Sequence, residues 1–272
     1  RSLNFDGGSW LRRLYLDNIL VSRRIRRQQF DLFVTLTNFG PIRVPCPHIL
    51  FQRNSLYFCN YYLNRIKGKL KAEIFLRRRL AVAAIMHADL IITPSYAMAD
   101  MIRETSSKTG CKEFRTLYRG FSEENLKLQS LDERFIDMLN RRGVKFLYPT
   151  HAAPHKGFEI LFEALACVKD SAPGFVFFMT ICHDDWPEGI RKYNDMVENL
   201  GLSEHVVFMG RIPQNQIGAV YQACDWMVYP SLCESFGFSM VEAISLGLPA
   251  VVADTPVNRE ICGDAALYYP PT

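Results

Sequence analysis

Residues 225–254 (DWMVYPSLCESFGFSMVEAISLGLPAVVAD) constrain the fold more than any other stretch of the chain. The apolar run at 225–231 ends in a proline and a serine, which is the pattern of a buried strand. A helical run at about 236–246 follows and is closed by a glycine and a proline. A second apolar run at 249–253 completes a strand–helix–strand unit. Such a unit places the start of its helix at the carboxyl edge of a parallel sheet.

Two carboxylates bracket the predicted helix start, Glu234 before it and Glu242 inside it, with the spacing E-x7-E. The backbone N–H groups at a helix start favour an anion such as a phosphate. Carboxylates there suit vicinal hydroxyls instead, and sugars and ribose present such hydroxyls. The combination predicts a nucleotide-sugar site. Two alternatives stay open, namely a capping box formed by Ser239 and Glu242, and a solvated loop acid at Glu234.

The stretch CESFGFSMVEAISLGLPAVVADTPVNREICGDAALYY resembles the E-x7-E region of the group 1 (family 4) glycosyltransferases of the GT-B fold. The resemblance implies an α/β protein with two Rossmann-like domains that face each other across a cleft, the N-terminal domain being incomplete here. It also implies retaining, metal-independent transfer of a sugar from a nucleotide diphosphate sugar to a glycan or lipid-linked acceptor. Cell-surface polysaccharide, lipopolysaccharide or glycolipid would be the product. No cofactor is implied beyond the nucleotide sugar as co-substrate.

The resemblance assigns roles to residues of this sequence. Lys156 would neutralise the diphosphate leaving group and Glu234 would bind donor-sugar hydroxyls, so these two are the catalytic candidates. Glu242 would hold the ribose hydroxyls. A solvated lysine at a helix start is the alternative for Lys156, and a surface arginine is the alternative for Arg211. The other donor-binding candidates are Phe236, Gly237, Phe238, Ser239, Gly210 and Arg211.

Two places depart from the family pattern. His151 stands five residues before Lys156, where an arginine is usual, and a neutral imidazole supplies less charge. A histidine often faces the reacting sugar in the family, but the corresponding strand end carries Arg53 and Asn54, and neither is assigned a catalytic role. These departures motivate a catalytically silent nucleotide-sugar-binding subunit as an alternative function. A nucleotide-sugar epimerase, which shares the fold, is a further alternative.

Strand and helix patterns alternate along the rest of the chain, which predicts parallel α/β architecture throughout. Strands are expected at 30–37, 48–51, 89–93, 114–118, 144–149, 174–181 and 205–209, and helices at 9–29, 61–88, 96–104, 158–168, 191–200 and 214–224. The predicted domains are 1–143, with a polar link from about 122, and 144–272. The chain starts at Arg1 and stops soon after a strand-like ALYY, so we expect a piece of a longer protein.

Charge is distributed unevenly along the sequence. Residues 1–150 hold 26 Lys and Arg against 13 Asp and Glu, whereas residues 151–272 hold 6 against 15. The basic residues concentrate in the predicted helices at 9–29 and 61–88. A solvated helix face is one interpretation, and an anionic membrane surface is another. Nucleic acid is not expected as a partner, because no nucleic-acid motif accompanies the charge.

The number and spacing of the cysteines indicate the redox state of the compartment in which the protein works. The eight cysteines form no C-x-x-C pair, and several lie in apolar segments. This pattern predicts neither a zinc site nor a disulfide framework and favours a reducing cytoplasm. The sequence also has no D-x-D motif, so no metal is expected. A cytoplasmic protein that is peripheral on the inner face of the membrane fits both the cysteines and the basic helices.

Overall fold

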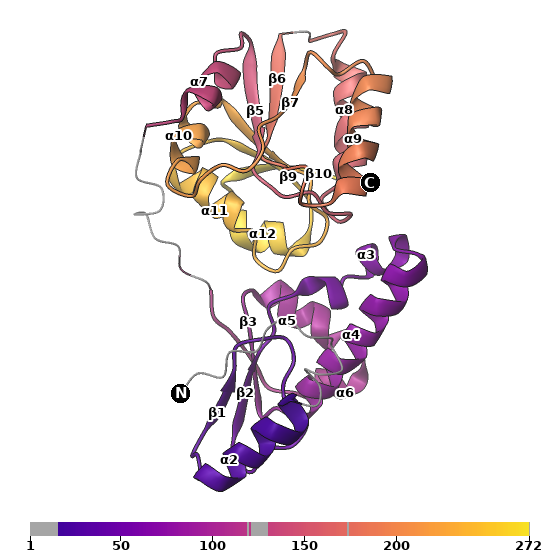
Figure 1. The fold of residues 1–272 in the computed structure, drawn as a ribbon, viewed down its shortest axis with the longest axis vertical. Helices are drawn as coiled ribbons and strands as arrows, with labels where there is room; N and C mark the ends of the chain where they lie inside the picture. The colour runs from indigo at the N-terminus through magenta and orange to yellow at the C-terminus, as the bar shows by residue number, and fades with distance from the viewer. Residues whose placement is uncertain (1–15, 119, 121–129, 173, 272) are drawn as a thin grey trace. The chain divides into compact units, whose positions relative to one another are not determined.

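The computed structural model describes residues 16–118, 120, 130–172 and 174–271, shown in Figure 1. The chain divides into two compact units, Arg1–Tyr118 and Arg119–Thr272, called the first and second unit below. Each unit is built on its own parallel sheet with helices packed on it. Every strand pair in both sheets is parallel, as the alternation of strands and helices predicts.

The first unit contains a four-stranded sheet in the order β1-β2-β3-β4. Its strands are β1 (Phe33–Thr35), β2 (His48–Phe51), β3 (Leu90–Thr93) and β4 (Phe114–Thr116). Its helices are η1 (Leu16–Val21), α2 (Ser22–Gln28), η2 (Ser55–Tyr57), α3 (Asn60–Arg65), α4 (Gly68–His87), α5 (Tyr96–Arg103) and α6 (Ser107–Gly110). The predicted strand at 48–51 is therefore confirmed with its bounds, and those at 89–93 and 114–118 are confirmed as slightly shorter strands.

The prediction of a buried strand at 30–37 was wrong about burial. Leu32, Val34 and Leu36 are 47%, 43% and 61% exposed, and they alternate along the chain, so they share one face. Within the described residues, β1 pairs with β2 on one side only, and its other side is an edge of the sheet. An apolar run alone does not distinguish a central strand from such an edge strand.

Of the two predicted basic helices, the second is interrupted. Residues 9–15 lie outside the described residues, and the rest of the first helix runs as η1 and α2 to Gln29, which has φ 47°. The second consists of α3 and α4. Ile66 between them is extended and only 4% exposed, and Gly68 adopts φ +58°. The extended Ile66 and Lys67 end α3 before α4 begins at Gly68.

The second unit contains a six-stranded sheet in the order β10-β9-β8-β5-β6-β7. Its strands are β5 (Val144–Tyr148), β6 (Phe175–Met179), β7 (Val206–Phe208), β8 (Trp226–Tyr229), β9 (Ala250–Ala253) and β10 (Ala266–Tyr269). This is the doubly wound dinucleotide-fold order, in which the chain reverses its direction of growth between β5 and β8. Ligands of such sheets bind outside the carboxyl ends of the strands at that reversal.

The helices of the second unit begin before the predicted domain boundary. They are α7 (Glu133–Leu139), α8 (Phe158–Val168), α9 (Pro187–Asn199), α10 (Ile217–Gln222), α11 (Phe238–Ser245) and α12 (Pro256–Cys262). Phe135 and Leu139 of α7 are 0% and 5% exposed and belong to this unit's core. Gln216 also exchanges two hydrogen bonds with Asp132, at 3.2 and 2.9 Å. The structure therefore moves the start of the second unit ahead of residue 144, while 121–129 of the predicted link lie outside the described residues.

Within the described residues, no helix has both the length and the apolar character needed to cross a bilayer.

Candidate functional site

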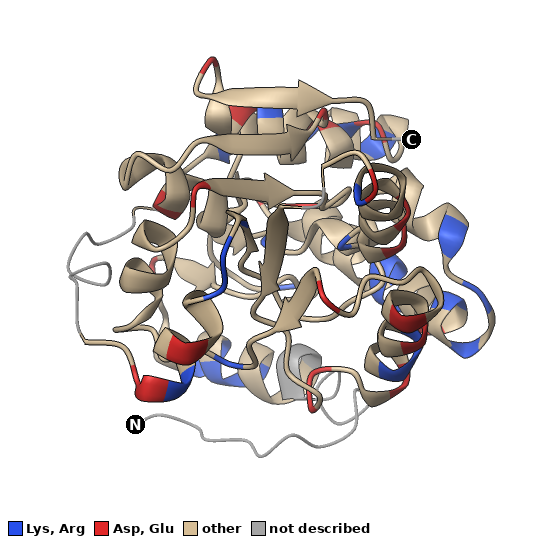
Figure 2. Cartoon of the chain, turned by 90° about the horizontal axis from the view of Figure 1, so that it is seen from above, with Lys and Arg blue, Asp and Glu red and all other residues tan. Residues whose placement is uncertain are grey.

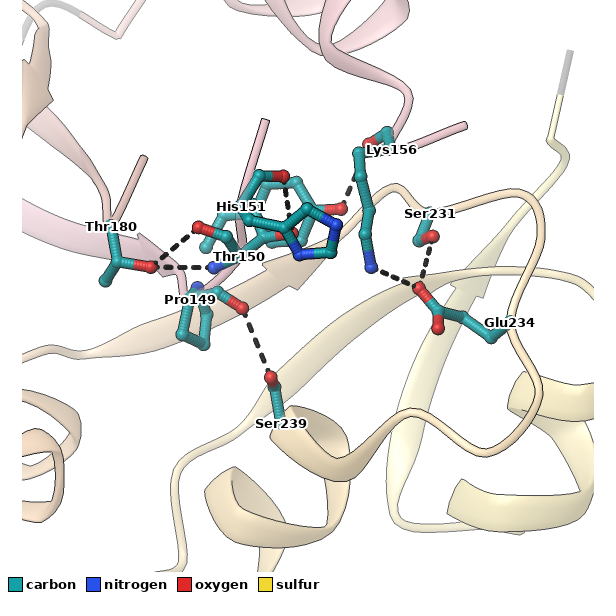
Figure 3. Close-up of polar contacts among 9 residues, drawn as sticks. Pro149, Thr150, His151, Lys156, Thr180, Ser231, Glu234 and Ser239 are labelled. Carbon is teal, nitrogen blue, oxygen red and sulfur yellow. Dashed lines mark hydrogen bonds and ion pairs between the residues drawn. The ribbon is translucent and has the colours of Figure 1, made fainter. Parts of the chain in front are cut away.

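The candidate site lies at the reversal point of the second sheet, where the chain leaves β5 and β8. The loop after β5 carries His151 and Lys156, and the loop after β8 carries Ser231 and Glu234 (Figure 3). The hydroxyl of Ser239, at the start of α11, donates to the Pro149 carbonyl at 3.1 Å. That bond ties the start of α11 to the loop after β5. The residues predicted from the E-x7-E stretch and from the K-G position therefore meet at one sheet edge.

A buried ion pair joins the two loops. The Nζ atom of Lys156 lies 2.7 Å from Oε1 of Glu234, and the two side chains are 8% and 13% exposed. The Ser231 hydroxyl donates to the same oxygen at 2.5 Å, and Figure 3 shows all three side chains converging. Both alternatives weighed for this pair, a solvated lysine at Lys156 and a solvated loop acid at Glu234, are wrong, because neither side chain is surrounded by water.

The surroundings keep Glu234 ionised. Burial by itself would raise the pKa of Glu234, but the Lys156 ammonium and the hydrogen bonds from Lys156 and Ser231 outweigh burial and hold the pKa below its usual value. The Lys156 ammonium also lies 5.8 Å from the centroid of the Tyr229 ring, within the range of a cation–π contact. The charges of this pair are therefore fixed in position by the protein itself.

The turn before α8 sets the position of Lys156. The carbonyl of Lys156 accepts a hydrogen bond from the buried Tyr148 hydroxyl at 3.0 Å. Gly157 follows with φ +70°, and a Cβ at this position would lie 2.3 Å from the Pro230 carbonyl oxygen. Only a glycine allows both this left-handed backbone and this close approach of the two loops. The sequence shows the K-G dipeptide, but it does not show that the glycine packs against the loop after β8.

A glycine stands at the start of α11. Gly237 occupies the cap position with φ 85° and has no side chain that could accept a capping hydrogen bond. The alternative of a capping box between Ser239 and Glu242 is therefore wrong. Ser239 binds Pro149 instead, and Glu242 Oε2 accepts a hydrogen bond from the Tyr221 hydroxyl at 2.8 Å. Phe236 is buried and Phe238 is half-buried beside this cap, with ring centroids 5.1 Å apart.

Glu242 is a second partly buried carboxylate, in the middle of α11. Burial raises the pKa of Glu242, and the hydrogen bond from Tyr221 offsets only part of that rise. Tyr221 comes from α10 and is 0% exposed. Sequence analysis missed Tyr221, and its only signal was a tyrosine on the buried face of the helix that leads into β8.

His151 lies beside Lys156 in Figure 3, and its residue is exposed. Its ring centroid is 6.3 Å from that of His155. Burial and then the Lys156 ammonium lower the pKa of His155 to about 3, so His155 is neutral at physiological pH. The loop is held in place by Thr180, which accepts from the Thr150 N–H at 2.8 Å and donates to the Thr150 carbonyl at 2.9 Å.

Gly210 and Arg211 lie at the end of β7, on the same carboxyl edge of the sheet. Gly210 has φ +76°, and a Cβ there would contact nothing within 4 Å. The Arg211 guanidinium lies 3.2 Å from Asp185 of the loop after β6, and its side chain is 77% exposed. Arg211 is thus a surface side chain with one carboxylate partner.

Arg53 and Asn54 belong to the first unit, at the carboxyl end of β2. Their N–H groups both donate to the Asn38 side-chain oxygen, at 2.6 and 2.9 Å. The Asn54 side chain accepts from the Leu56 N–H at 2.9 Å and so caps η2. Arg53 is exposed. Asn38, which the sequence analysis did not single out, fixes the backbone of this strand end.

Within the part of the chain that the structure describes, no three His, Cys, Asp or Glu side chains gather as ligands of a metal ion would. The site's positive charge close to Glu234 comes from Lys156.

The chain is similar to known glycosyltransferases in sequence. A profile of the family described as Glycosyl transferases group 1 matches residues 131–271. The chain is 23% identical over 194 residues to the O-antigen chain mannosyltransferase RfbU of Salmonella typhimurium, a match covering 71% of this chain and 50% of RfbU. It is 34% identical over 104 residues to the D-inositol 3-phosphate glycosyltransferase of Corynebacterium glutamicum, covering 37% of this chain and 24% of that protein. The chain thus spans half or less of the length of these relatives.

The chain is also similar to solved structures. HepE of Anabaena, crystallised in complex with UDP-glucose, superposes with a TM-score of 0.69 at 22% identity, over 93% of this chain and 68% of HepE. At that identity the likeness shows the fold alone. The chain has the mixed α/β architecture with parallel sheets of the GT-B glycosyltransferases, as its sequence predicts.

Proposed function

The chain belongs to the group 1 glycosyl transferases, and we propose that it moves a sugar from a nucleotide diphosphate sugar to a glycan or lipid-linked acceptor, with retention of configuration. The single observation that carries this proposal is the buried Lys156–Glu234 pair at the reversal point of a six-stranded parallel sheet. A cation and a hydroxyl acceptor stand there side by side, next to the start of a helix.

Each part of a nucleotide diphosphate sugar has a matching group at this edge. The Lys156 ammonium neutralises the charge that develops on the diphosphate as the bond to the sugar breaks. The N–H groups of Phe236 to Phe238 add the positive end of α11. Glu234 accepts hydrogen bonds from sugar hydroxyls, and Glu242, which Tyr221 orients at 2.8 Å, accepts those of the ribose.

Holding the Lys156–Glu234 pair in position before the substrate reacts favours the proposed transfer. A charge held in place before the reaction starts needs no rearrangement in the transition state, where the diphosphate becomes more negative. Glu234 holds Lys156 at 2.7 Å, and Ser231 holds Glu234 at 2.5 Å. Retention and independence of a metal follow the family resemblance, and Lys156 is the group assigned to balance the leaving diphosphate.

The first unit suits an acceptor at a membrane surface. Its long helix α4 exposes Lys69, Lys71 and Arg79 together with Phe75, which is 57% exposed. Exposed basic side chains are attracted to the negative surface potential of an anionic bilayer. RfbU is named for the O-antigen chain, so a cell-surface glycan is the acceptor class that we favour. The protein would then act in the cytoplasm, on the inner face of the membrane.

Thermal-shift screening of the full-length protein against uridine, guanosine and adenosine diphosphate sugars tests the proposal. At least one should stabilise the protein, and transfer or slow hydrolysis of that sugar should follow. Binding without turnover would support the catalytically silent subunit instead. A changed donor sugar with no acceptor present would support the epimerase.

Glu242→Ala tests the ribose contact. A lost hydrogen bond to a charged group should weaken nucleotide binding by roughly 1–3 kcal/mol, measured by titration calorimetry. Glu163→Ala is the matched control, because Glu163 is an exposed glutamate on α8 and its removal should leave affinity unchanged. Equal affinities for the two variants would disprove the role of Glu242.

A further inference from the structure

The side chain of His151 is a titratable group at the reversal point that the proposed reaction does not use. It follows β5 by three residues, and the protein covers it only in part. In Figure 3 its imidazole is drawn between Thr150 and the Lys156 side chain, and it interacts electrostatically with the Lys156 ammonium. A diphosphate held by Lys156 would therefore come close to this ring.

The ionised groups around His151 already neutralise one another. Lys156 is paired with Glu234 at 2.7 Å, and Arg211 is paired with Asp185 at 3.2 Å. These two pairs sum to no net charge, whereas a nucleotide diphosphate sugar brings two negative charges. The start of α11 supplies only a partial positive charge. One further cation at this place would neutralise one of the two ligand charges, in addition to the partial charge of the helix start.

His151 can supply that cation, because it is largely neutral beforehand. Partial burial of the ring and then the Lys156 ammonium lower its pKa below the usual value of 6.5, and Asp185 and Glu234 offset this only in part. The neighbouring His155 does not take this role. Its pKa of about 3 and its 9% exposure keep it neutral inside the loop. A diphosphate beside His151 would reverse the direction of the pKa shift.

We propose that His151 takes up a proton when a nucleotide diphosphate sugar binds, so that affinity rises as the pH falls. The inference rests on the proposed function, since it needs a diphosphate at Lys156. The sign follows from linkage: the bound state holds more protons than the free state, so lowering the pH favours binding. The dependence is confined to the interval between the free and bound pKa values of His151. Its slope cannot exceed one power of ten in Kd for each pH unit, because one proton is involved.

Titration calorimetry on the full-length protein measures the proton directly. The ligand is whichever of the uridine, guanosine and adenosine diphosphate sugars the thermal-shift screen returns. As diphosphate diesters, these sugars do not themselves titrate between pH 5.5 and pH 8. At pH 7, the observed enthalpy in buffers of different ionisation enthalpy should give a positive uptake of between zero and one proton. The Kd should fall from pH 8 to pH 6.

Two substitutions separate protonation from a structural role. His151→Arg carries the charge at every pH, so it should bind at least as tightly as the wild type does at pH 6, with no proton uptake and a flat pH profile. His151→Gln cannot be charged, so it should bind more weakly than the wild type below pH 7 and also show no uptake. If the His151 ring only supported the loop, both substitutions would weaken nucleotide-sugar binding to a similar extent.

Two results would overturn the inference, and they differ from each other. Binding of the sugar nucleotide by the wild type with zero proton uptake, or with a pH dependence that His151→Arg retains, overturns the role of His151 alone. Failure of every nucleotide sugar to bind at any pH overturns both this inference and the proposed function.

Discussion

The carboxyl edges of the two sheets are built differently. In the second unit, the charged side chains at this edge are buried and bonded to each other, with Lys156 and Glu234 only 8% and 13% exposed. In the first unit, the Asn38 side chain fixes the backbone of the strand end, and several large side chains at this edge are exposed. Arg53 is exposed there, and Tyr96 and Tyr118 are 60% and 51% exposed. One edge carries a buried ion pair, and the other carries exposed side chains.

The two units also differ in net charge. Residues 1–118 contain 20 Lys and Arg against 8 Asp and Glu, a net charge of +12, whereas residues 119–272 contain 12 against 20, a net charge of −8. Figure 2 colours these residues blue and red. Surface charge of one sign acts over about a Debye length and selects partners broadly. A buried ion pair instead selects a ligand through direct contacts with it. Substitutions should therefore have sharp, local effects in the second unit and graded effects in the first.

Breaking the buried pair should have the largest effect. Lys156→Met leaves the Glu234 carboxylate buried without its cation, which should cost roughly 3–5 kcal/mol of unfolding free energy and abolish nucleotide-sugar binding. Urea unfolding followed by tryptophan fluorescence measures the loss, because Trp186 and Trp226 both lie in the second unit. A stability within about 1 kcal/mol of the wild type would show that the pair is not held as tightly as its geometry indicates.

The double variant Lys156→Met/Glu234→Gln is the control for this effect. It removes both charges, so most of the stability should return while binding stays absent. The acid response differs too. Because the folded-state pKa of Glu234 is depressed, its contribution is complete above the unfolded-chain value of 4.5 and is lost as the pH falls below that value. The double variant should lack this part of the acid destabilisation.

Gly157 should show the next largest effect. Gly157→Ala places a methyl group against the Pro230 carbonyl and strains a left-handed backbone, so we expect a loss of roughly 2–4 kcal/mol and misplacement of Lys156. Gly247→Ala is the matched control, since Gly247 has a similar φ of +74° and nothing within 4 Å of an added Cβ. It should cost roughly 1 kcal/mol and leave turnover nearly unchanged. Equal losses would mean that the contact between the two loops contributes nothing.

Sequence patterns predicted the second unit better than the first. The helix at 158–168 has the predicted bounds, and β8, α11 and β9 lie inside the stretch at 225–254. Strong apolar runs, each closed by glycine or proline, define these elements locally. In the first unit, the exposed face of β1 and the helix break at Ile66 and Lys67 were not predicted. Burial of β1 depends on sheet neighbours, which a local pattern does not contain.

The candidate site was predicted as a set of residues but not as a set of bonds. E-x7-E and the K-G dipeptide identified Glu234, Glu242 and Lys156, whose chemistry is visible in the residue types. Their partners Ser231 and Tyr221 were missed, although they fix both carboxylates. These bonds depend on which loops the strand order brings together. The order β5-β8, which no local pattern encodes, is what places residue 156 beside residue 234.

The exposed basic helix should give the smallest effect per residue. Lys69, Lys71 and Arg79 of α4 are exposed. Glu73, the acid within this helix, is paired with Arg77. Each basic side chain near an anionic bilayer contributes about 1 kcal/mol, so each single change to alanine should weaken binding to phosphatidylserine vesicles about fivefold. Sedimentation with vesicles at low salt measures this, and binding of the wild type should fall as salt rises.

Lys192→Ala is the matched control for the vesicle experiment, because Lys192 is an exposed lysine on α9 of the acidic second unit. If the contrast between the units decides which surface meets the membrane, this variant should sediment as the wild type does. Vesicles of phosphatidylcholine alone should retain little protein, since the charge term vanishes while the Phe75 side chain remains. Equal losses of vesicle binding for Lys192→Ala and Lys69→Ala would show that the net charge of the protein, and not α4, causes the attraction. If sedimentation with vesicles does not depend on salt, the basic residues of the first unit are a solvated helix face and not a membrane-binding surface.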